Sequence, residues 1–350
     1  MEETVTRKLM CVKFCNDLID GSMNKLKCVI RSQAKKSHII RKCFNTYCKC
    51  RFRRSPKSVA NSDYRRVLGR DINWDNPKNL IEKIYWMLFN TDTTLWSLCA
   101  DKYRVREFVE ERGCGNLLNE LYGKWDKVEE VDYDSLPNSF VLKTNNSSGQ
   151  VIIVKDKQKL NRKDANVKLS RWLRFVYGLT NSQLHYMRIE PCIIAEELLV
   201  DSKNPEGELI DYKVWCINGE PQCVLVFYGR KGDSYKMTAY DMEWNNISSK
   251  VLRRTSPHYC GMEIERPASL SLMLEAARKL SAGFPEVRVD FYEIDEKPIF
   301  GELTFSTGYG SLTDEYYEYL GNKIDLEKLT RIPEQEILYS IPVVKSILKG

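Results

Sequence analysis

The sequence predicts an α+β fold in which helices are mixed with antiparallel strands. Two runs of alternating apolar and polar residues, Val287–Tyr292 and Phe300–Phe305, are typical of a β-hairpin. A second hairpin is indicated by Asn218-Gly219, a strong turn signal between two further apolar runs. Segments with helical periodicity lie between the strands. This mixed order favours an α+β class over alternating βαβ units.

The elements are expected in the following order along the chain. A polar linker at Ser55–Asp75, with Ser-Pro, Asn and Asp signals, leads into the globular body. Apolar residues three or four apart then predict helices, and short apolar runs next to turn residues predict strands. The expected elements are two helices between Pro77 and Cys99 that separate at Asn90–Asp92, a helix over Asp101–Glu111, strands at Phe140–Lys143 and Val151–Val154, a basic amphipathic helix over Arg162–Tyr177, strands at Ile193–Ala195, Asp211–Ile217 and Gln222–Tyr228, and a helix over Ser269–Ala282.

Composition limits the class of protein. The chain has 350 residues, of which 43% are hydrophobic, enough for the core of one large or two ordinary domains. No apolar run approaches the length of about 20 residues that spans a bilayer, and no signal peptide opens the sequence. The 12 cysteines show no disulfide framework of the small secreted type. We therefore expect a soluble cytoplasmic protein.

Positive charge is concentrated at the N-terminus. Residues 1–60 contain 15 Lys and Arg against 4 Asp and Glu, whereas the remaining 290 residues contain 39 basic and 44 acidic residues. A basic, mainly helical extension of this kind can bind a polyanion, such as nucleic acid, an anionic membrane surface or an acidic polysaccharide. A solubilising helical lead-in accounts for the same composition equally well.

The hairpin at residues 287–305 carries polar residues with a clear chemical meaning. Side chains repeat every second residue along a strand, so Arg288, Asp290, Glu302 and Thr304 can point to one face. Two carboxylates side by side form an oxygen site suited to Mg²⁺, and the adjacent arginine suits a phosphate or a developing oxyanion. A solvated hairpin face of mixed charge is the alternative for these residues taken alone.

Two lysines indicate the rest of a nucleotide site. Lys143 ends a strand and precedes the loop Thr144–Gly149, whose backbone N–H groups can close over phosphates. Lys102 lies at the start of an expected helix. The G-x-x-x-x-G-K-[ST] pattern of a Walker A loop is absent. Together with the carboxylate hairpin, these segments predict a nucleotide held between two lobes.

Taken in order, these segments resemble the ATP-grasp superfamily, and within it the TupA-like group linked to teichuronopeptide and related surface polysaccharides. The resemblance runs from about Asp71 to Gly321 and leaves the basic N-terminus and the C-terminal end uncovered. The segments that carry it are Ala100–Phe108, Leu136–Lys143, Ile194–Leu198, Asp211–Trp215 with Asn218-Gly219, and Val287–Tyr292 with Gly301–Phe305.

The resemblance implies a division of the chain into lobes that clamp ATP. We expect a basic extension at residues 1–60, a helical region at 61–135, a small ATP-grasp lobe at 136–199, a large catalytic lobe at 200–330 and a tail at 331–350. The nucleotide-binding residues that the resemblance implies are Lys102, Lys143, Asn146, Ser147, Ser148, Gly149, Glu196, Glu197, Leu199, Asp211 and Lys213.

Within this set the resemblance implies particular roles. The two lysines contact the ATP phosphates, and the loop at residues 146–149 covers them. Glu196, Glu197 and Leu199 lie in the hinge and read the adenine edge, while Asp211 meets the ribose hydroxyls. These roles follow from the family pattern.

The resemblance also implies roles for the hairpin residues. Asp290 and Glu302 bind Mg²⁺, and Arg288 stabilises the oxyanion of a tetrahedral intermediate, as in the D-alanine ligase branch. Many ATP-grasp ligases end this motif with Glu-x-Asn, whereas this chain has Thr304 at the last position. Because a hydroxyl is a weaker donor, one metal is expected to be bound loosely or through water. The following loop, Ser306–Gly310, is either substrate-facing or a structural turn.

The implied activity is ATP-dependent and Mg²⁺-dependent carboxylate–amine ligation through an acyl phosphate. By resemblance, the carboxylate belongs to a uronic acid of a cell-surface polysaccharide or its precursor and the amine to an amino acid, although an amino sugar as nucleophile is equally compatible. The basic N-terminus is expected to meet the acidic acceptor or the inner face of an anionic membrane. Nucleic acid is not an expected partner.

A glycosyltransferase-like or carbohydrate-binding protein that retains the fold is the alternative from another class. Asp132-Tyr133-Asp134 has the D-x-D pattern of metal-dependent glycosyltransferases, but it lies in a charged connector without a preceding apolar strand. Lys143, Arg288, Asp290 and Glu302 together favour catalysis, because a degenerate binding module would not need all four.

Overall fold

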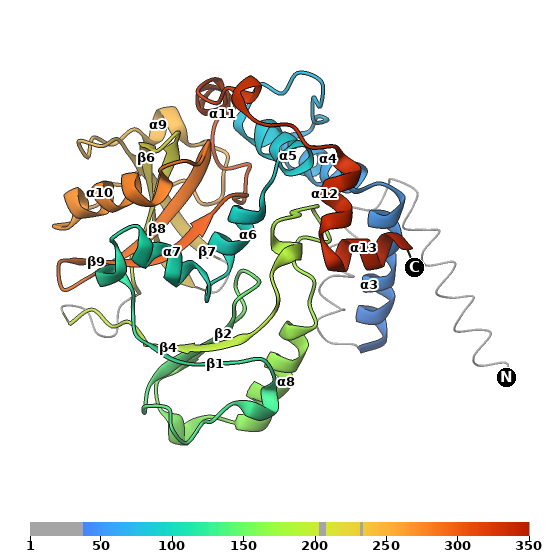
Figure 1. The fold of residues 1–350 in the computed structure, drawn as a ribbon. Helices are drawn as coiled ribbons and strands as arrows, with labels where there is room; N and C mark the ends of the chain where they lie inside the picture. The colour runs from blue at the N-terminus through green and yellow to red at the C-terminus, as the bar shows by residue number, and fades with distance from the viewer. Residues whose placement is uncertain (1–37, 203–207, 232–233, 350) are drawn as a thin grey trace, which may run out of the picture.

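The computed structural model describes residues 38–202, 208–231 and 234–349, and these form two antiparallel β-sheets flanked by helices (Figure 1). The smaller sheet has four strands in the order β1-β4-β2-β3, and the larger has five in the order β7-β6-β5-β8-β9. Neighbouring strands in both sheets run antiparallel. The predicted α+β class is therefore confirmed.

The four-stranded sheet contains the strands predicted around Lys143. β2 (Phe140–Thr144) pairs with β3 (Val151–Val154) and with β4 (Ile193–Glu196), as the apolar runs predicted. β1 (Leu121–Trp125) was not predicted, because Gly123 interrupts its pattern and lies at a shift in its register with β4. The helix α8 (Arg162–Leu173) packs on β2 and ends earlier than expected.

The five-stranded sheet forms the larger lobe, and α10 (Leu270–Ser281) packs on it. Its strands are β5 (Asp211–Ile217), β6 (Glu220–Lys231), β7 (Ser234–Tyr240), β8 (Glu286–Ile294) and β9 (Lys297–Thr304). Apolar residues such as Val214, Val287 and Val289 alternate along β5 and β8 and are buried in the core. The residues between them point to the opposite face, where the polar contacts gather.

Two-residue turns join the hairpins of this sheet. Asn218 and Gly219 join β5 to β6 with φ of 50° and 83°, as a type I′ turn requires. Asp295 and Glu296, with φ of 49° and 64°, join β8 to β9 in the same way. This connection is shorter than the predicted strands Val287–Tyr292 and Phe300–Phe305 implied, because β8 continues to Ile294 and β9 begins at Lys297.

The helices ahead of the sheets largely follow the prediction. α5 (Leu80–Asn90) and α6 (Thr94–Ala100) separate where the sequence indicated, and reciprocal hydrogen bonds between Asn79 and Glu82 cap α5. α7 (Val105–Glu111) begins later than Asp101. The remaining short elements are α9 (Ser248–Val251), α11 (Asp314–Asn322) and 3₁₀ turns at Gly115–Leu117 (η1), Val128–Glu130 (η2), Lys157–Lys159 (η3), Tyr186–Arg188 (η4) and Leu326–Lys328 (η5).

The prediction of a linker at Ser55–Asp75 was wrong. α3 (His38–Arg54) is followed at once by α4 (Pro56–Leu68), which has Ser55 as its N-cap and ends at Gly69, where φ is 73°. The Ser-Pro pair therefore starts a helix. The residues of these two helices that are almost fully buried in the core are Phe52, Val59, Ala60 and Tyr64.

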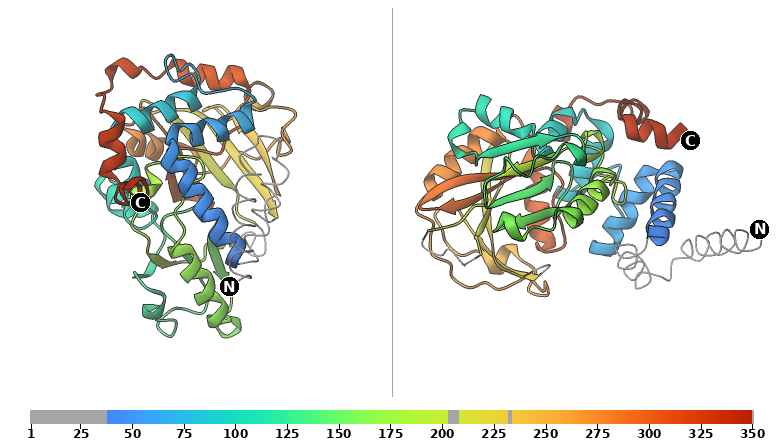
Figure 2. Two further views of the ribbon diagram at one scale, coloured as in Figure 1. Left: turned by 90° about the vertical axis from the view of Figure 1, so that its right-hand side faces the viewer. Right: turned by 90° about the horizontal axis from the view of Figure 1, so that it is seen from below.

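The C-terminal helices lie next to these N-terminal helices. α12 (Glu334–Ser340) packs on α5, and α13 (Pro342–Lys349) packs on α3, so that α3 and α13 share one flank of the molecule (Figure 2). Part of the basic extension, residues 1–37, lies outside the described residues. The described part of the extension is helical, and α4 belongs to the core.

The division into lobes stays a proposal. A separate core cluster, which includes Leu142 and Leu169, joins the small sheet to α8 and is distinct from the core of the larger lobe. β1 lies ahead of the boundary expected at residue 136, and the boundary expected at residue 60 falls inside α4. Within the described residues, the helices are too short or too polar to cross a bilayer.

Candidate active site

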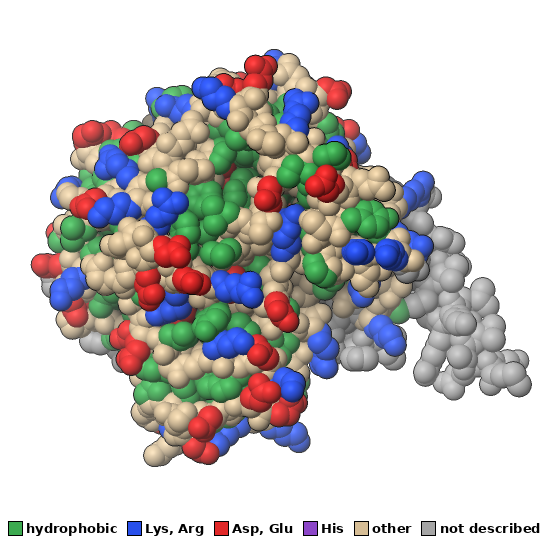
Figure 3. All heavy atoms as spheres, in the orientation of Figure 1, with side chains coloured by type: hydrophobic (Ala, Val, Ile, Leu, Met, Phe, Trp, Pro, Cys, Tyr) green, Lys and Arg blue, Asp and Glu red, His purple; other side chains and the backbone are tan. Residues whose placement is uncertain are grey.

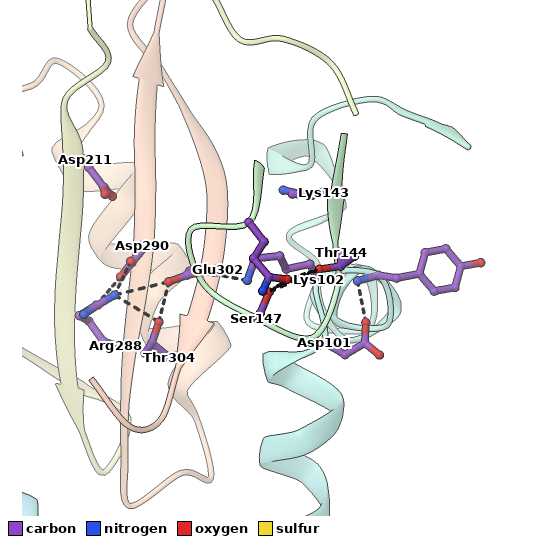
Figure 4. A network of polar contacts seen from close by, with 12 residues as sticks. Asp101, Lys102, Lys143, Thr144, Ser147, Asp211, Arg288, Asp290, Glu302 and Thr304 are labelled. Carbon is purple, nitrogen blue, oxygen red and sulfur yellow. Dashed lines mark hydrogen bonds and ion pairs between the residues drawn. The ribbon is translucent and has the colours of Figure 1, made fainter. Parts of the chain in front are cut away.

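Four polar side chains gather on one face of the β8–β9 hairpin (Figure 4). The register places Arg288 opposite Thr304 and Asp290 opposite Glu302. Arg288 Nε and Nη2 donate to the two carboxylate oxygens of Asp290 at 2.6 and 2.7 Å, and Nη2 also donates to Thr304 Oγ1 at 3.2 Å. Thr304 Oγ1 donates to Glu302 Oε1 at 3.0 Å. The common face predicted for these residues is therefore observed.

The neighbouring strand β5 adds Asp211 and Lys213 to this face. Lys213 lies opposite Asp290 in the register, with its Nζ 2.5 Å from Asp290 Oδ2 and 2.7 Å from Asp211 Oδ2. Arg230 on β6 reaches Asp211 Oδ2 at 3.3 Å. Each of the two aspartates thus lies between two cations, which allows both carboxylates to sit in the centre of a sheet.

This network is largely shielded from water. Asp290 is 2% exposed and Asp211 is 7% exposed. Burial raises the pKa of Asp211, and the ammonium of Lys213 acts in the opposite direction. Burial alone would lower the pKa of Arg288, but Asp290 and Glu302 outweigh it and raise the pKa of this guanidinium. Arg288 is therefore a fixed positive charge.

Glu302 connects the hairpin to Lys102, at the start of the segment before α7. Its Oε2 lies 3.3 Å from Lys102 Nζ, and its Oε1 lies 3.6 Å from Arg288 Nη2 (Figure 4). Burial alone would raise the pKa of Glu302, but Lys102, Lys213 and Arg288 hold it well below its usual range. The Glu302 side chain is 31% exposed, against 3% for Asp290, so it is the more open of the two carboxylates.

Lys143 lies at the end of β2, on the small sheet. Its ammonium pairs with Glu196 on the adjacent strand β4, and Asn119 Nδ2 donates to the same carboxylate at 3.5 Å. The structure thus brings Lys143 together with Glu196, another residue of the implied nucleotide site. It does not place Lys143 in contact with the hairpin carboxylates.

The loop after β2 is fixed at its base and open at its tip. The Asn145 side chain donates to Glu190 O and accepts from Cys192 N, at 3.0 and 2.7 Å. Asn146 and Ser147 are buried, whereas Ser148 is exposed. The backbone of Lys102 donates to Asn145 O at 3.2 Å, so the loop base also holds the Lys102 segment. An open tip on a fixed base suits a loop that covers a ligand.

The stretch after β4 holds the residues expected in the hinge. Glu197 N donates to Glu120 O at 2.9 Å, and the Glu197 carboxylate accepts from Glu120 N at 3.3 Å. Leu199 is half-buried. The adenine-reading role of these residues stays a prediction, as does the ribose-binding role of Asp211.

The segment from Phe175 to Arg188 contacts the loop after β9, where Gln183 Nε2 donates to Ser306 O at 3.2 Å. Beyond Tyr177, where a helix was expected to end, the sequence analysis missed this segment. Burial raises the pKa of Tyr177 and Tyr186, and the nearby carboxylate of Glu302 raises both further. The two tyrosine rings lie 4.8 Å apart. This segment has neither helical nor strand periodicity, so its aromatic content was the only available signal.

His185, in the same segment, is fully buried, and burial lowers its pKa to about 3. Its Nε2 lies 3.5 Å from Ser306 Oγ, just beyond the end of β9. Its ring packs near Trp96, Tyr186 and Phe305. His185 thus connects the segment to the loop that follows the hairpin.

The loop Ser306–Gly310 is anchored by α4 at its second half. Tyr309 Oη donates to Asp63 Oδ2 at 2.9 Å. Gly310 has a φ of 103°, and a Cβ there would lie 2.6 Å from Val67 Cγ1, so only glycine fits. Residues 309–310 therefore form a structural turn, while Ser306 lies beside His185 at the edge of the site.

The oxygen donors fit a hard divalent cation such as Mg²⁺. Asp290, Glu302 and Thr304 supply two carboxylates and a hydroxyl on one face. Within the described residues, no group of three or more His, Cys, Asp or Glu side chains forms a metal site on its own. A metal at this hairpin would take its remaining ligands from nucleotide phosphates and water.

The D-x-D pattern has a structural role. Tyr133 is buried and donates to Asn166 Oδ1 at 2.6 Å, and Asp134 pairs with Arg162 at 2.6 Å. Asp132 Oδ1 accepts the backbone N–H of Asp134 at 3.1 Å. A turn and a contact with α8 account for all three residues.

The two antiparallel sheets and the helices that flank them form an ATP-grasp fold. A model of the TupA-like ATP-grasp family matches residues 82–325, and the chain belongs to this family. The predicted family is therefore confirmed. The matched region contains both sheets and every residue of the proposed site, but neither α3–α4 nor α12–α13. Among curated proteins, none matched the chain.

Several solved structures show a distant similarity to this chain. D-alanine–D-alanine ligase from Bacillus anthracis complexed with ATP is 14% identical, with 75% of this chain and 72% of that chain covered and a TM-score of 0.40. L-amino acid ligase from Bacillus licheniformis is 15% identical, with 70% and 53% covered and a TM-score of 0.41. Phosphoribosylamine–glycine ligase from Thermotoga maritima is 13% identical, with 62% and 50% covered and a TM-score of 0.38. The matches span about half of the last two chains.

Proposed function

We propose that the protein is an ATP-dependent, ADP-forming ligase that joins a carboxylate to an amine. The observation that supports this most strongly is the buried Arg288, held by two hydrogen bonds on Asp290 and lying beside the ionised Glu302. A permanently charged guanidinium in a shielded site suits an oxyanion, and two carboxylates beside it suit the metal of a nucleotide.

The nucleotide would lie between the small sheet and the hairpin. Lys102 and Lys143 are assigned to its phosphates, since they point from opposite segments toward carboxylates that phosphates can replace as partners. The loop at residues 146–149 would cover the phosphates, with Glu196, Glu197 and Leu199 at the adenine. Lys213 and Asp211, on the large sheet, are the remaining residues assigned to the nucleotide.

Binding of the nucleotide would exchange partners within the network. In the structure, Lys102 and Arg288 neutralise Glu302. Phosphate oxygens compete for these cations because they also carry negative charge. The carboxylates of Asp290 and Glu302, with the Thr304 hydroxyl, would then hold Mg²⁺, which supplies charge neutralisation to the transferring phosphoryl group.

The reaction would proceed in two substitutions. A substrate carboxylate oxygen attacks the γ-phosphorus, the bond to the ADP oxygen breaks, and an acyl phosphate forms. The amine then attacks the carbonyl carbon, and Arg288 stabilises the oxyanion that develops there. The bond between carbonyl carbon and phosphate oxygen breaks, inorganic phosphate leaves, and the amine loses one proton as the amide forms.

The proposed substrates are an acidic sugar and an amino acid. The carboxylate is assigned to a uronic acid of a surface polysaccharide or its precursor, and the opposite assignment with an amino sugar as nucleophile uses the same chemistry. The family match and the basic extension support this class of acceptor. The need for ATP places the proposed reaction in the cytoplasm, at the membrane face if the acceptor is lipid-linked.

Product analysis tests the proposal. The protein is mixed with ATP, candidate uronates and amino acids, and the products are identified by mass spectrometry. We expect an amide together with ADP and phosphate in equal amounts. AMP and pyrophosphate would exclude the proposed chemistry, and consumption of a nucleotide sugar in place of ATP would favour a glycosyltransferase that retains the fold.

A further inference from the structure

α3 and α13 form a surface that contains no acidic residue. Neither helix has an Asp or a Glu, and the two helices pack together at one flank of the molecule. Figure 3 shows Lys and Arg side chains along the right-hand edge, where these helices lie. The exposed cations of this basic surface are Lys42, Lys49, Arg53 and Arg54 of α3 and Lys345 and Lys349 of α13.

These six cations have no carboxylate partner in the part of the chain that the structure describes. Among exposed cations elsewhere, some, such as Lys236, Arg266 and Lys297, also have no carboxylate partner in the described residues, and others have one. Examples are the pairs Arg65–Asp71, Lys124–Asp126, Arg162–Asp134, Lys279–Glu275 and Lys328–Asp325. What distinguishes the basic surface is that its six cations lie together and neither helix carries an acidic residue, so the like charges repel one another.

Helix electrostatics account for only part of this arrangement. Cations in the last turn of a helix interact favourably with its C-terminal carbonyl groups, which suits Arg53 and Arg54 on α3. Lys42, Lys49 and Lys345 lie outside the last turns of their helices. An anionic ligand would account for their position beside the other cations.

The basic surface is linked to the candidate active site through packed residues. A small cavity of about 30 Å³ lies between α3 and the segment at Leu179-Thr180. Next to it, Ser182 Oγ donates to Pro56 O at 2.7 Å. The same segment reaches the end of the hairpin, where Gln183 Nε2 donates to Ser306 O at 3.2 Å and His185 Nε2 lies 3.5 Å from Ser306 Oγ. A ligand on α3 would thus lie next to the segment that reaches the end of the hairpin.

We propose that this basic surface binds an acidic polymer that carries carboxylates. From residue 42 onward, no large hydrophobic side chain of α3 or α13 is exposed, which argues against insertion into a membrane. The aromatic residues of α3 in this range are buried or half-buried, so they offer no platform on which nucleic acid bases could stack. A flexible chain of carboxylates matches the surface, because lysine and arginine at intervals along two helices can each pair with one.

The identity of this polymer as the acceptor rests on the proposed function, but its binding does not. In the proposed reaction, a polymer held on α3 would present a carboxylate to the site across the segment at residues 177–186. The basic surface would then raise the local concentration of the acceptor without contacting the reacting atoms.

Binding of polygalacturonate in the absence of ATP tests the inference. The test variant is Lys49→Glu/Arg53→Glu/Arg54→Glu, and a second variant, Lys345→Glu/Lys349→Glu, changes α13 alone. The matched control is Lys236→Glu/Arg266→Glu/Lys297→Glu, which makes the same change of charge at exposed cations of the large lobe. Titration calorimetry at low salt measures the affinity, and thermal unfolding confirms that each variant is folded.

We expect the α3 variant to lose roughly tenfold or more in affinity, and the control to change less than about twofold, because local charge on the surface sets the attraction. The α13 variant should show an intermediate loss. Ligation of a monomeric uronate should be unchanged in the α3 variant, which separates this inference from the proposed function. Equal losses in test and control variants would overturn it. Comparable binding of neutral dextran, or stronger binding of DNA or of phosphatidylglycerol vesicles, would also overturn it.

Discussion

The charged face of the five-stranded sheet differs from the basic surface of α3 and α13 in whether its charges are paired. On the sheet, Asp211, Lys213, Arg288, Asp290 and Glu302 each have a partner of opposite sign within 3.6 Å. On the basic surface, the six exposed cations have none in the described residues. A charged side chain that is paired can be buried in a fixed geometry. An unpaired charged side chain stays in water and attracts ions of opposite sign over a distance that the ionic strength sets.

The two regions should therefore respond differently to substitution. Removing one partner of a buried pair leaves an uncompensated charge and typically costs about 3–5 kcal/mol. Changing an exposed charge usually alters stability by about 0.5 kcal/mol or less. Changes in the sheet network should affect chemistry and stability together, and changes on the basic surface should affect binding alone.

The largest effect is expected at the two hairpin carboxylates. Asp290→Asn and Glu302→Gln should each reduce ATP turnover by roughly a thousandfold, because each removes a full charge from a shielded site. Steady-state release of ADP measures the loss, and circular dichroism verifies the fold. Glu296→Gln in the turn of the same hairpin is the matched control. Near-normal Mg²⁺-dependent turnover in either variant would show that the metal site lies elsewhere.

The two lysines should differ in their effect on the nucleotide. Lys143→Ala is expected to weaken binding of a non-hydrolysable ATP analogue by roughly 10- to 100-fold, since a charged hydrogen bond contributes about 1.5–3 kcal/mol. Lys102→Ala should weaken it less, because Lys143 sits at the base of the loop that is proposed to cover the phosphates. Titration calorimetry compares the two. Equal losses, or a larger loss for Lys102→Ala, would contradict the loop assignment.

Salt should weaken binding at the basic surface much more than binding at the charged face of the sheet. Raising NaCl from 0.1 to 1 M shortens the Debye length from about 10 to about 3 Å. Polygalacturonate affinity should then fall by roughly tenfold or more, while affinity for the ATP analogue should change by less than about threefold, because shielded pairs are screened much less. Both constants are measured on the same protein. Similar slopes against salt would mean that the nucleotide site is as open as the basic surface.

A smaller effect, on the pH dependence of stability, is expected from His185, which lies in the segment between the two regions. Its folded pKa of about 3 lies below the unfolded value of about 6.5, so the unfolded chain binds a proton that the folded chain does not. The free energy of unfolding should therefore fall as pH drops below about 6.5, by up to about 1.4 kcal/mol per pH unit from this group. His185→Phe should remove that share of the slope in denaturant titrations between pH 6.5 and 5.5. If the free energy of unfolding has the same slope against pH in the wild type and the variant, His185 is charged in the folded protein over this pH range.

Much of the large lobe could be predicted from the sequence. β8 alternates between polar and apolar residues from Glu286 to Phe291, and β5 does so from Asp211 to Val214. The turn at Asn218-Gly219 has a single favoured geometry. The shared face of Arg288 and Asp290 followed directly from this period. The partner of Asp290 on β5, Lys213, required the pairing of two strands far apart in the sequence.

Other parts depended on contacts that the sequence does not display. The polar composition of residues 55–75 indicated a linker, but Phe52 and Ala60 are buried by tertiary packing that composition does not reveal. A deletion of residues 1–60 would therefore remove part of the core as well as basic charge. The segment around Tyr186 has no regular period and is positioned by its neighbours.

Transfer of oxygen-18 tests the central proposal most directly. The protein is supplied with ATP, an amine and a uronate whose carboxylate is labelled with oxygen-18. If an acyl phosphate forms, one labelled oxygen passes to inorganic phosphate as the amide forms, and mass spectrometry of the phosphate detects it. We predict one labelled oxygen in each phosphate released in the ligation. Amide formation with unlabelled phosphate would contradict the proposed mechanism.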